Sequence, residues 1–321
     1  MQIESFRVFR DLAETESFTK AAQINGVTQS AVSQQVSSLE RQFEAMLIER
    51  SKKRFRLTRE GELLYQTAKD MVRLYDTFEA QMQEMRDVVS GMLRVGTIYS
   101  LGLYNLPPYL RKFMRAHPGV NVHVAYLRSN LVYEEVSGNA IDLGLVAYPV
   151  KDPQVDIVPI GRDRLVLICP PGHARAREAA VPVKALDGEK FVSFEPDIPT
   201  RRAIDRAMSA AHVGVQHVME VDNIETVKRA VEIGLGVSVV PQSTVVREVE
   251  LGTLVQVELD GGDFVRPLAA IVKKGKVQSP AMKQFLATLR EPLNAAEPAE
   301  PAAAPAPRAS RRAATTASAG A

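Results

Sequence analysis

The segment from Glu16 to Glu40, ESFTKAAQINGVTQSAVSQQVSSLE, constrains the fold more than any other part of the 321-residue chain. It opens with a small apolar face at helical spacing, made of Phe18, Ala21 and Ala22. Asn25 and Gly26 tolerate a left-handed turn, and the next hydroxyl residue, Thr28, can cap a second helix. That helix has its own apolar positions, which are Ala31, Val32, Val36 and Leu39. The pattern predicts two short helices joined by a tight turn.

The second of these helices would turn hydroxyl and amide groups outward, from Gln29, Ser30, Ser33, Gln34 and Ser37. Such groups can hydrogen bond to base edges and phosphates. A helical hairpin on its own is more often structural than DNA-binding. The preceding residues, however, predict another amphipathic helix, with apolar positions at Ile3, Phe6, Phe9, Leu12 and Ala13. Together the three helices would form the core of a helix-turn-helix DNA reader.

A basic segment follows this helical region. RSKKRFRLTR, residues 50–59, carries six cations and no acid. A charge run is usually a solvated face, but Phe55 and Leu57 alternate with the cations in the manner of a β-hairpin. The segment is therefore interpreted as a wing whose cations would lie along the phosphate backbone.

The first 61 residues resemble the winged helix of LysR-type transcriptional regulators. The resemblance rests on SFTKAA, VTQSAVSQQVSSLE, Glu49-Arg50 and RLTREG, in which the family more often has alanine than Glu60. It implies DNA contacts by Thr28, Gln29, Ser30, Ser33 and Gln34 from the recognition helix, and by Arg50, Lys52, Lys53 and Arg54 from the wing. The family often has arginine at the position of Gln34, so the base preference there is open.

A long amphipathic helix is predicted next. Its apolar residues alternate steps of four and three, at Leu64, Ala68, Met71, Tyr75, Phe78, Met82, Met85 and Val89. Thr58 can cap its start and Ser90-Gly91 its end, which gives about 30 residues and about 45 Å. The helix could pack on its own chain, but the regular seam favours a coiled-coil dimer. The resemblance implies the same, because the linker helix of the family dimerises.

From Gly91 the pattern alternates strands and helices, which is typical of α/β units. Spacing alone allows either one continuous sheet or two lobes, with crossovers near residues 160–163 and 263–267. The resemblance selects the two-lobed periplasmic-binding-protein-like fold. The predicted organisation is an all-α winged helix-turn-helix domain (1–58), a linker dimerisation helix (59–90), a two-lobed α/β effector-binding domain (91–292) and a disordered Ala/Pro-rich tail (293–321). Within the effector domain, lobe I comprises 91–162 and 266–292, and lobe II comprises 163–265.

A ligand cleft is expected between the lobes, where strand ends and helix N-termini favour anions. The effector-binding candidates follow successive strands: Tyr99, Ser100, Leu101, Ser129, Asn130, Ala147 and Tyr148 in lobe I, and Phe194, Thr200 and Arg201 in lobe II. Hydroxyl and amide residues at these places are also ordinary helix caps. Arg201 and Arg202 could be surface charges, but the hypothesis is that Arg201 helps select a small anionic metabolite.

Other motifs indicate structure rather than catalysis. Asp222 and Glu225 have the spacing of a helix capping box, and GLGVSVVP from Gly234 lacks the further glycine and acid of a dinucleotide loop. Cys169, the sole cysteine, lies in an apolar run and is expected to be buried. The histidines form no metal or triad pattern. The sequence therefore predicts no enzyme, catalytic site, metal or cofactor.

The chain is expected to be cytoplasmic and free of the membrane, because it shows neither a signal peptide nor a long apolar run. The net charge of +2 means that DNA affinity must come from a local patch and from dimerisation. The predicted partners are double-stranded promoter DNA, a small-molecule effector, a second copy in a homodimer or homotetramer, and RNA polymerase. Two alternatives stay open: a ligand-insensitive architectural DNA-binding protein, and an enzyme or solute-binding protein with an incidental helical hairpin.

Overall fold

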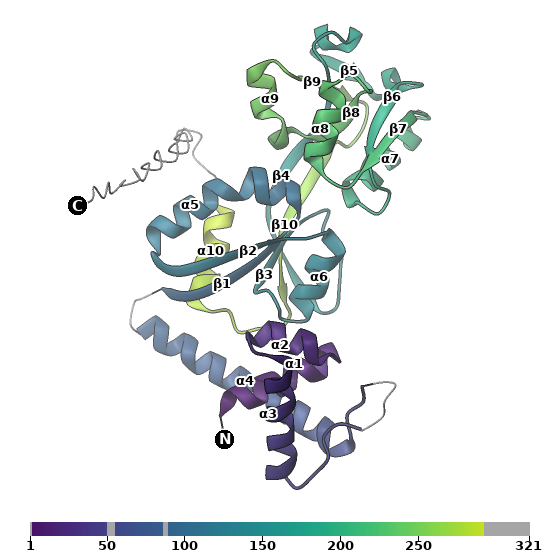
Figure 1. Cartoon of the computed structure of the whole chain (residues 1–321). Helices are drawn as coiled ribbons and strands as arrows, with labels where there is room; N and C mark the ends of the chain where they lie inside the picture. The colour runs from purple at the N-terminus through teal and green to yellow at the C-terminus, as the bar shows by residue number, and fades with distance from the viewer. Residues whose placement is uncertain (1, 50–54, 86–88, 292–321) are drawn as a thin grey trace, which may run out of the picture. The chain divides into compact units, whose positions relative to one another are not determined.

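The computed structural model describes residues 2–49, 55–85 and 89–291, and its first part is helical (Figure 1). The helices are α1 (Ile3–Thr15), α2 (Phe18–Asn25) and α3 (Gln29–Gln42). Gly26 ends α2 in the left-handed conformation, with φ at 64°, and Thr28 Oγ1 accepts a hydrogen bond from Ala31 N at 3.2 Å. The turn and its cap are those that the sequence predicts.

One apolar core holds these helices together. Its buried members are Val8, Phe9, Leu12, Ala21, Ala22, Val32, Val36, Leu39 and Leu47. The predicted wing begins as an antiparallel pair, because Ile48 bridges Leu57 and Glu49 N donates to Arg56 O at 2.9 Å. The wing candidates Arg50, Lys52, Lys53 and Arg54 lie outside the described residues.

The long helix α4 (Arg59–Met85) follows the wing directly. Thr58 Oγ1 accepts a hydrogen bond from Gly61 N at 2.9 Å and so caps its first turn. Two parts of the predicted helix need correction. Ala68 is fully buried against Phe6, because α4 lies on α1 of its own chain, so this residue is not left for a seam. Leu64 is partly buried against the same cluster, and its place in a seam stays a prediction. Ser90 already belongs to a strand, so the cap predicted at Ser90-Gly91 is wrong.

Within residues 89–291, an eight-stranded mixed sheet runs through both lobes. Its strands are β1 (Ser90–Thr97), β2 (Gly119–Tyr126), β3 (Leu143–Ala147), β4 (Val155–Cys169), β5 (Ala180–Pro182), β8 (Ser238–Pro241), β9 (Val255–Asp260) and β10 (Val265–Lys273). Strands β6 (Lys190–Phe194) and β7 (Gln216–Val221) form a separate parallel pair. The order β2-β1-β3-β10-β4-β9-β5 therefore places lobe I at one end and lobe II at the other.

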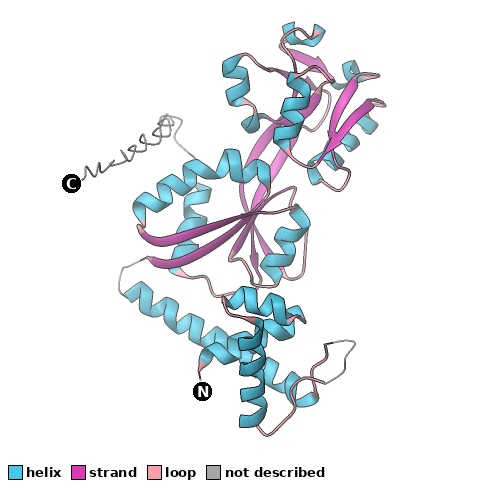
Figure 2. Cartoon of the chain, in the orientation of Figure 1, coloured by secondary structure: helices cyan, strands magenta, loops and turns pink. Residues whose placement is uncertain are grey.

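The two crossovers lie inside long strands rather than in loops. The first half of β4 pairs antiparallel with β10 in lobe I, and its second half pairs with β8 and β9 in lobe II. Figure 2 shows these strands continuing from one lobe to the other. The two lobes and the continuous sheet, which the sequence left as alternatives, thus occur together, and the two-lobed α/β fold class is confirmed.

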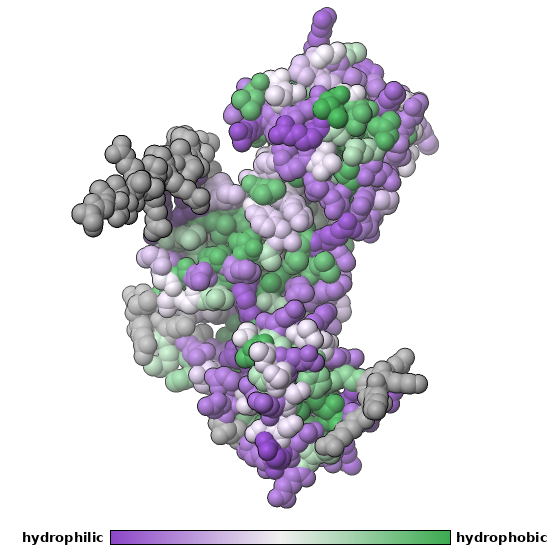
Figure 3. All heavy atoms as spheres, in the orientation of Figure 1, coloured by the Kyte–Doolittle hydropathy of each residue, from purple (hydrophilic) through white to green (hydrophobic). Residues whose placement is uncertain are grey.

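Helices cover the sheet in both lobes. Lobe I has the π-helical segment η1 (Leu101–Asn105) and helices α5 (Leu106–Ala116), α6 (Ser129–Ser137) and α10 (Pro280–Arg290). Lobe II has η2 (Ala174–Arg177), η3 (Val183–Leu186), α7 (Pro199–Ala210), α8 (Ile224–Glu232), η4 (Gln242–Thr244) and α9 (Val246–Leu251). The face in Figure 3 carries apolar side chains over lobe I among hydrophilic ones. The aromatic rings of Phe113 and Phe285 join α5 to α10, with centroids 5.0 Å apart.

Candidate DNA-binding and ligand-binding sites

The predicted recognition helix α3 presents a polar face. Gln29, Ser30, Ser33, Gln34 and Ser37 are exposed, whereas the apolar residues of the same helix enter the core. Thr28 is exposed as well, although its hydroxyl already caps the helix and lies 2.9 Å from Ser30 Oγ. The exposed face can therefore offer hydroxyl and amide groups to a DNA groove.

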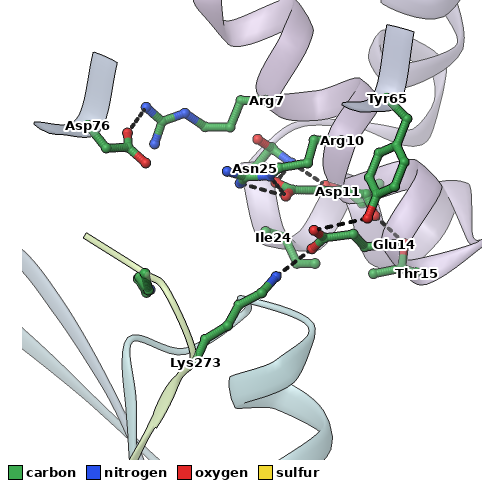
Figure 4. A network of polar contacts seen from close by, with 12 residues as sticks. Arg7, Arg10, Asp11, Glu14, Thr15, Ile24, Asn25, Tyr65, Asp76 and Lys273 are labelled. Carbon is green, nitrogen blue, oxygen red and sulfur yellow. Dashed lines mark hydrogen bonds and ion pairs between the residues drawn. The ribbon is translucent and has the colours of Figure 1, made fainter. Parts of the chain in front are cut away.

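A buried carboxylate fixes α2, and through the turn α3, on α1. Asp11 lies between Arg10 and Asn25 (Figure 4), with its oxygens 2.7 Å from Arg10 Nη2 and 2.9 Å from Asn25 Nδ2. Burial raises the pKa of Asp11 above its usual value, in spite of the neighbouring arginine. Arg7 of α1 also pairs with Asp76 of α4 at 2.7 Å. These contacts position the helix that would read DNA.

A cavity of about 780 Å³ lies between the two lobes of the effector domain. Eight of the ten effector-binding candidates line it: Tyr99, Ser100, Ser129, Asn130, Ala147, Tyr148, Phe194 and Thr200. The residues of lobe I lie at or after the ends of β1, β2 and β3, whereas Phe194 and Thr200 lie at or after the end of β6 in the separate β6-β7 pair, and these strand ends of the two lobes face the same cavity. Their contact with a ligand stays a prediction.

Leu101 and Arg201 do not line the cavity, which corrects the prediction at both positions. Leu101 is buried in the apolar core of lobe I. The guanidinium of Arg201 is buried and already bound, because it donates to Asp205 Oδ1 at 2.8 Å, Glu220 Oε1 at 2.9 Å and Phe194 O at 2.6 Å. The hypothesis that Arg201 selects an anion is therefore wrong.

The sequence reasoning missed Arg266, a residue of β10 that does line the cavity. Arg266 is 1% exposed, and its Nη2 donates to Ser100 Oγ at 2.6 Å. Its Nε and Nη1 have no hydrogen-bond partner among the described residues, and Nη1 lies 3.8 Å from Asp163 Oδ2. Burial lowers the pKa of Arg266 to about 10, so the group is charged at neutral pH. Nothing in the sequence around Arg266, which lies in a strand next to Pro267, indicates that this arginine lines a cavity.

Charged contacts span the lobes around the cavity. Arg128, which follows β2, pairs with Glu195 at 2.9 Å, Asp197 at 3.2 Å and Asp222 at 3.4 Å, all from lobe II. Asp222 does not act in the capping box predicted with Glu225, because Asn223 caps α8 by accepting from Thr226 N at 3.0 Å. On another side of the interface, Tyr104 of η1 hydrogen bonds to Lys228 of α8.

The described residues contain no group of three or more His, Cys, Asp or Glu side chains placed to hold a metal ion. In the same part of the chain, no helix is long and apolar enough to cross a membrane. Cys169 is buried in β4, and burial raises the pKa of its thiol to about 11. A neutral buried thiol is a packing residue rather than a nucleophile.

Family comparisons agree with this division of the chain. Residues 3–62 match the family described as the bacterial regulatory helix-turn-helix protein, lysR family, and residues 86–294 match the LysR substrate binding domain. The HTH-type transcriptional regulator CysL of Bacillus subtilis is 30% identical over 243 residues, which cover 76% of this chain and 81% of CysL. The RuBisCO operon transcriptional regulator of Allochromatium vinosum is 30% identical over 285 residues, covering 89% and 94%.

Solved structures show the same architecture. A full-length OxyR variant from Pseudomonas aeruginosa has a TM-score of 0.66 at 20% identity and covers 90% of this chain and 95% of its own. The Synechocystis CcmR regulatory domain, solved in complex with 2-PG, has a TM-score of 0.58 at 26% identity, covering 63% of this chain and 96% of its own. Both curated relatives are named as transcriptional regulators rather than enzymes. The chain belongs to the LysR-type family of ligand-responsive, DNA-binding transcriptional regulators.

Proposed function

We propose that this chain binds promoter DNA as a dimer through α3 and the wing, and that a small ligand in the cavity between the lobes controls this binding. The observation that carries the proposal is a polar, exposed helix face and an inter-lobe cavity in one chain. The first can read DNA and the second can hold a metabolite. The wing cations at positions 50, 52, 53 and 54 are proposed to contact phosphates.

Control of DNA binding requires that the ligand prefer one arrangement of the lobes over another. Residues of both lobes line the cavity, so a ligand can bridge Ser100 or Ser129 on one side and Thr200 on the other. We expect closure around the ligand to change the geometry of the dimer, the bending of the promoter and the access of RNA polymerase. The site of action would be the cytoplasm.

The relatives suggest where to look for ligands and targets. CcmR was solved with 2-PG, and the Allochromatium vinosum relative is named for the RuBisCO operon. For this chain we propose only that 2-PG is a suitable first member of a metabolite panel. The genomic DNA fragments that the protein binds would identify its target genes.

The test is selection of bound fragments from the genomic DNA of the source organism by the purified full chain. Ser33→Ala and Gln34→Ala should each weaken binding to the selected site by about 1–3 kcal/mol and should leave random DNA nearly unaffected. Matched controls are Ser209→Ala and Gln284→Ala, which change exposed residues of the same types in the effector domain. Equal losses on both DNAs would refute base reading by α3.

A constitutive architectural role is the second candidate, because the lobes could serve oligomerisation alone. It predicts a footprint that no metabolite alters. Uniform recovery of all fragments would also favour it over sequence-specific regulation.

A further inference from the structure

The DNA-reading head, residues 3–49, touches lobe I of its own chain through polar contacts. Lys273 Nζ, at the end of β10, donates to Glu14 Oε2 of α1 at 2.7 Å (Figure 4). Arg94 Nη1 of β1 donates to Ile24 O of α2 at 3.4 Å. These partners come from two strands of lobe I and from two adjacent helices of the head. The contact therefore includes the helix that directly precedes the turn into α3.

The ion pair between Glu14 and Lys273 is partly withdrawn from water, because the two side chains are only 12% and 25% exposed. The hydroxyl of Tyr65, from α4, lies 3.5 Å from the other oxygen of Glu14. Burial and the nearby Glu14 carboxylate raise the pKa of Tyr65 to about 12, so the phenol stays protonated and can donate to Glu14. A partly buried pair is screened less by salt than an exposed one. This pair can therefore hold the head against lobe I at ordinary ionic strength.

A second group of charges fixes Arg94 within lobe I. Asp142 accepts from the backbone amide of Arg94 at 2.8 Å, and its other oxygen lies 3.4 Å from Arg94 Nη2. Lys276 Nζ also donates to Asp142, at 2.8 Å. Arg94 is thereby held with Nη1 at Ile24 O, one of the last carbonyls of α2. A cation is favourable there, because the carbonyl end of a helix carries the negative end of its dipole.

The head and lobe I do not share an apolar core. The apolar clusters around the head take their members from residues 3–72, and those of lobe I take theirs from residues 89–289, so no apolar cluster among the described residues spans the contact. A groove of about 1050 Å³ lies beside the ion pair instead, and residues of both sides line it, such as Gln23 and His123. A polar contact next to a groove can open without exposing apolar core to water. It can therefore exist in two states, closed and open, as coupling between sites requires.

Strand β10 connects this contact to the inter-lobe cavity. Arg266, near the start of the strand, lines the cavity, and Lys273, at its end, holds Glu14. At about 3.3 Å per residue, the two positions are about 23 Å apart along the strand. Strand β10 pairs with β3 on one side and with β4 on the other. A strand held on both sides moves as a stiff unit, so a shift of the cavity wall displaces Lys273 as well.

We infer that the Lys273–Glu14 ion pair and the Arg94–Ile24 hydrogen bond form a detachable latch, through which lobe I controls the position of the DNA-reading head of the same chain. This inference rests on the proposed function, because it names the route by which the inter-lobe cavity and α3 affect each other. With the latch closed, the head and lobe I move as one body, and a rearrangement of the lobes changes the placement of α3. With the latch open, the lobes can rearrange while the head keeps its place.

The first test measures the distance between the head and lobe I in the full chain without DNA. Spin labels at Arg41→Cys of α3 and Gln284→Cys of α10 report it, because both positions are exposed and the native Cys169 is buried. Co-expression with an excess of unlabelled chain keeps one labelled copy in each dimer. We expect a narrow distribution of distances in the otherwise wild-type chain. Lys273→Glu should broaden it, because two carboxylates would then repel each other across the contact.

Two further variants make this result specific to the ion pair. Lys274→Glu makes the same change of charge at the exposed neighbouring residue and should keep the narrow distribution. The exchanged pair, Glu14→Lys with Lys273→Glu, should restore it. The exchanged pair also guards against a folding defect, since a second reversed charge would not rescue a misfolded chain. A Lys273→Glu distribution as narrow as that of the wild type, or an exchanged pair as broad as the single variant, would overturn the latch.

The second test uses the selected promoter fragment as its probe, because coupling between sites is reciprocal: if the lobes move the head, DNA on the head must alter the lobes. Hydrogen exchange is followed at saturating DNA in segments 127–133 and 194–200, which contribute to the lining of the inter-lobe cavity. We expect DNA to change the exchange rates there by about fivefold or more in the wild type and in the exchanged pair. In Lys273→Glu, DNA should leave them unchanged. No effect of DNA in the wild type, or the same effect in Lys273→Glu, would overturn the inference.

Footprints of the same proteins with and without the metabolite panel separate the latch from ligand control. If a metabolite changes the footprint of the wild type and of Lys273→Glu alike, ligand control stands and the latch fails. If no metabolite changes the footprint, but DNA alters the cavity lining only while the ion pair is intact, the latch stands and ligand control of DNA binding fails.

Discussion

Arg201 and Arg266 are both nearly buried, yet their surroundings differ. Three acceptors at 2.6–2.9 Å surround the guanidinium of Arg201. Arg266 has one such acceptor, Ser100 Oγ. A satisfied buried cation stabilises its own lobe, whereas an unsatisfied one beside a cavity is available to a ligand.

Arg201→Met should therefore lower the stability of the chain. We expect the free energy of unfolding to fall by about 1–3 kcal/mol, because Phe194 O loses its donor and two carboxylates lose their cation. Urea denaturation measures this change. Arg229→Met is the matched control, since Arg229 pairs with Glu232 at the surface, where water screens the pair, and its loss should change the stability much less. An Arg201→Met protein as stable as the wild type would contradict this structural role.

The close packing of Gly61 leads to a second prediction about a single residue. A Cβ at this position would lie 2.0 Å from Leu47 O, a backbone atom that cannot move away cheaply. Gly61→Ala should separate the start of α4 from the helical core and lower its stability by about 1–3 kcal/mol. Gly161→Ala serves as control, because nothing lies within 4 Å of its Cβ. Equal melting temperatures for the two variants would show that α4 does not pack as described.

At the scale of elements, α8 joins the lobes through Lys228. This side chain is 2% exposed, and its Nζ donates to Glu248 at 2.8 Å, to Thr244 O at 3.1 Å and to Tyr104 of lobe I. Burial lowers the pKa of Lys228, but the hydrogen bonds to Glu248, Tyr104 and Glu225 outweigh burial and raise it above its ordinary value of 10.5. The folded state thus favours the charged form.

This raised pKa predicts a specific pH dependence. Because the pKa is higher in the folded chain, the stability contributed by Lys228 is fully present below the unfolded pKa of 10.5 and is lost as the pH rises through the folded value. The free energy of unfolding of the wild type should exceed that of Lys228→Met by a constant amount at neutral pH, and the gap should shrink above pH 10.5. Lys184→Met, at an exposed lysine of lobe II, should show no such gap. A gap that widens at alkaline pH would contradict this assignment.

We expect the exposed apolar side chains in the second half of α4 to form the dimer contact. Leu74 and Phe78 are 73% and 56% exposed, and Met71 and Met82 are also exposed. Phe78→Lys and Met71→Lys should dissociate the dimer, because each places a charge on the apolar stripe. Gln66→Lys, at an exposed polar position of the same helix, is the control. Sedimentation at micromolar concentration reports the mass, and a Phe78→Lys protein that sediments like the wild type would refute the dimer assignment.

At the scale of the whole molecule, local sequence patterns predicted the elements well. The Gly26 turn, the Thr28 cap and the buried face of α3 all follow from rules that act within one or two turns of helix. The resemblance to a known family supplied the two-lobed arrangement. The ends of the predicted strands then placed most of the effector-binding candidates at the cavity, including Ser100 in lobe I and Thr200 in lobe II.

Predictions failed where the outcome depends on contacts distant in sequence. Ala68 has coiled-coil spacing, yet Phe6 of α1 covers it. Arg201 lies at a helix start that faces the cleft region, yet Glu220 of β7 captures it. Arg266 reaches Ser100, which is 166 residues away in the sequence. Periodicity and spacing carry no information about such pairs, because they describe only neighbours along the chain.

The central claim is that one chain couples a DNA-reading helix to a ligand cavity. The most direct measurement is a footprint of the wild-type protein on its selected promoter site, with and without a panel of small organic acids that includes 2-PG. We predict that at least one member of the panel changes the pattern of protection of the wild type. A footprint that stays the same with every member of the panel would contradict the account.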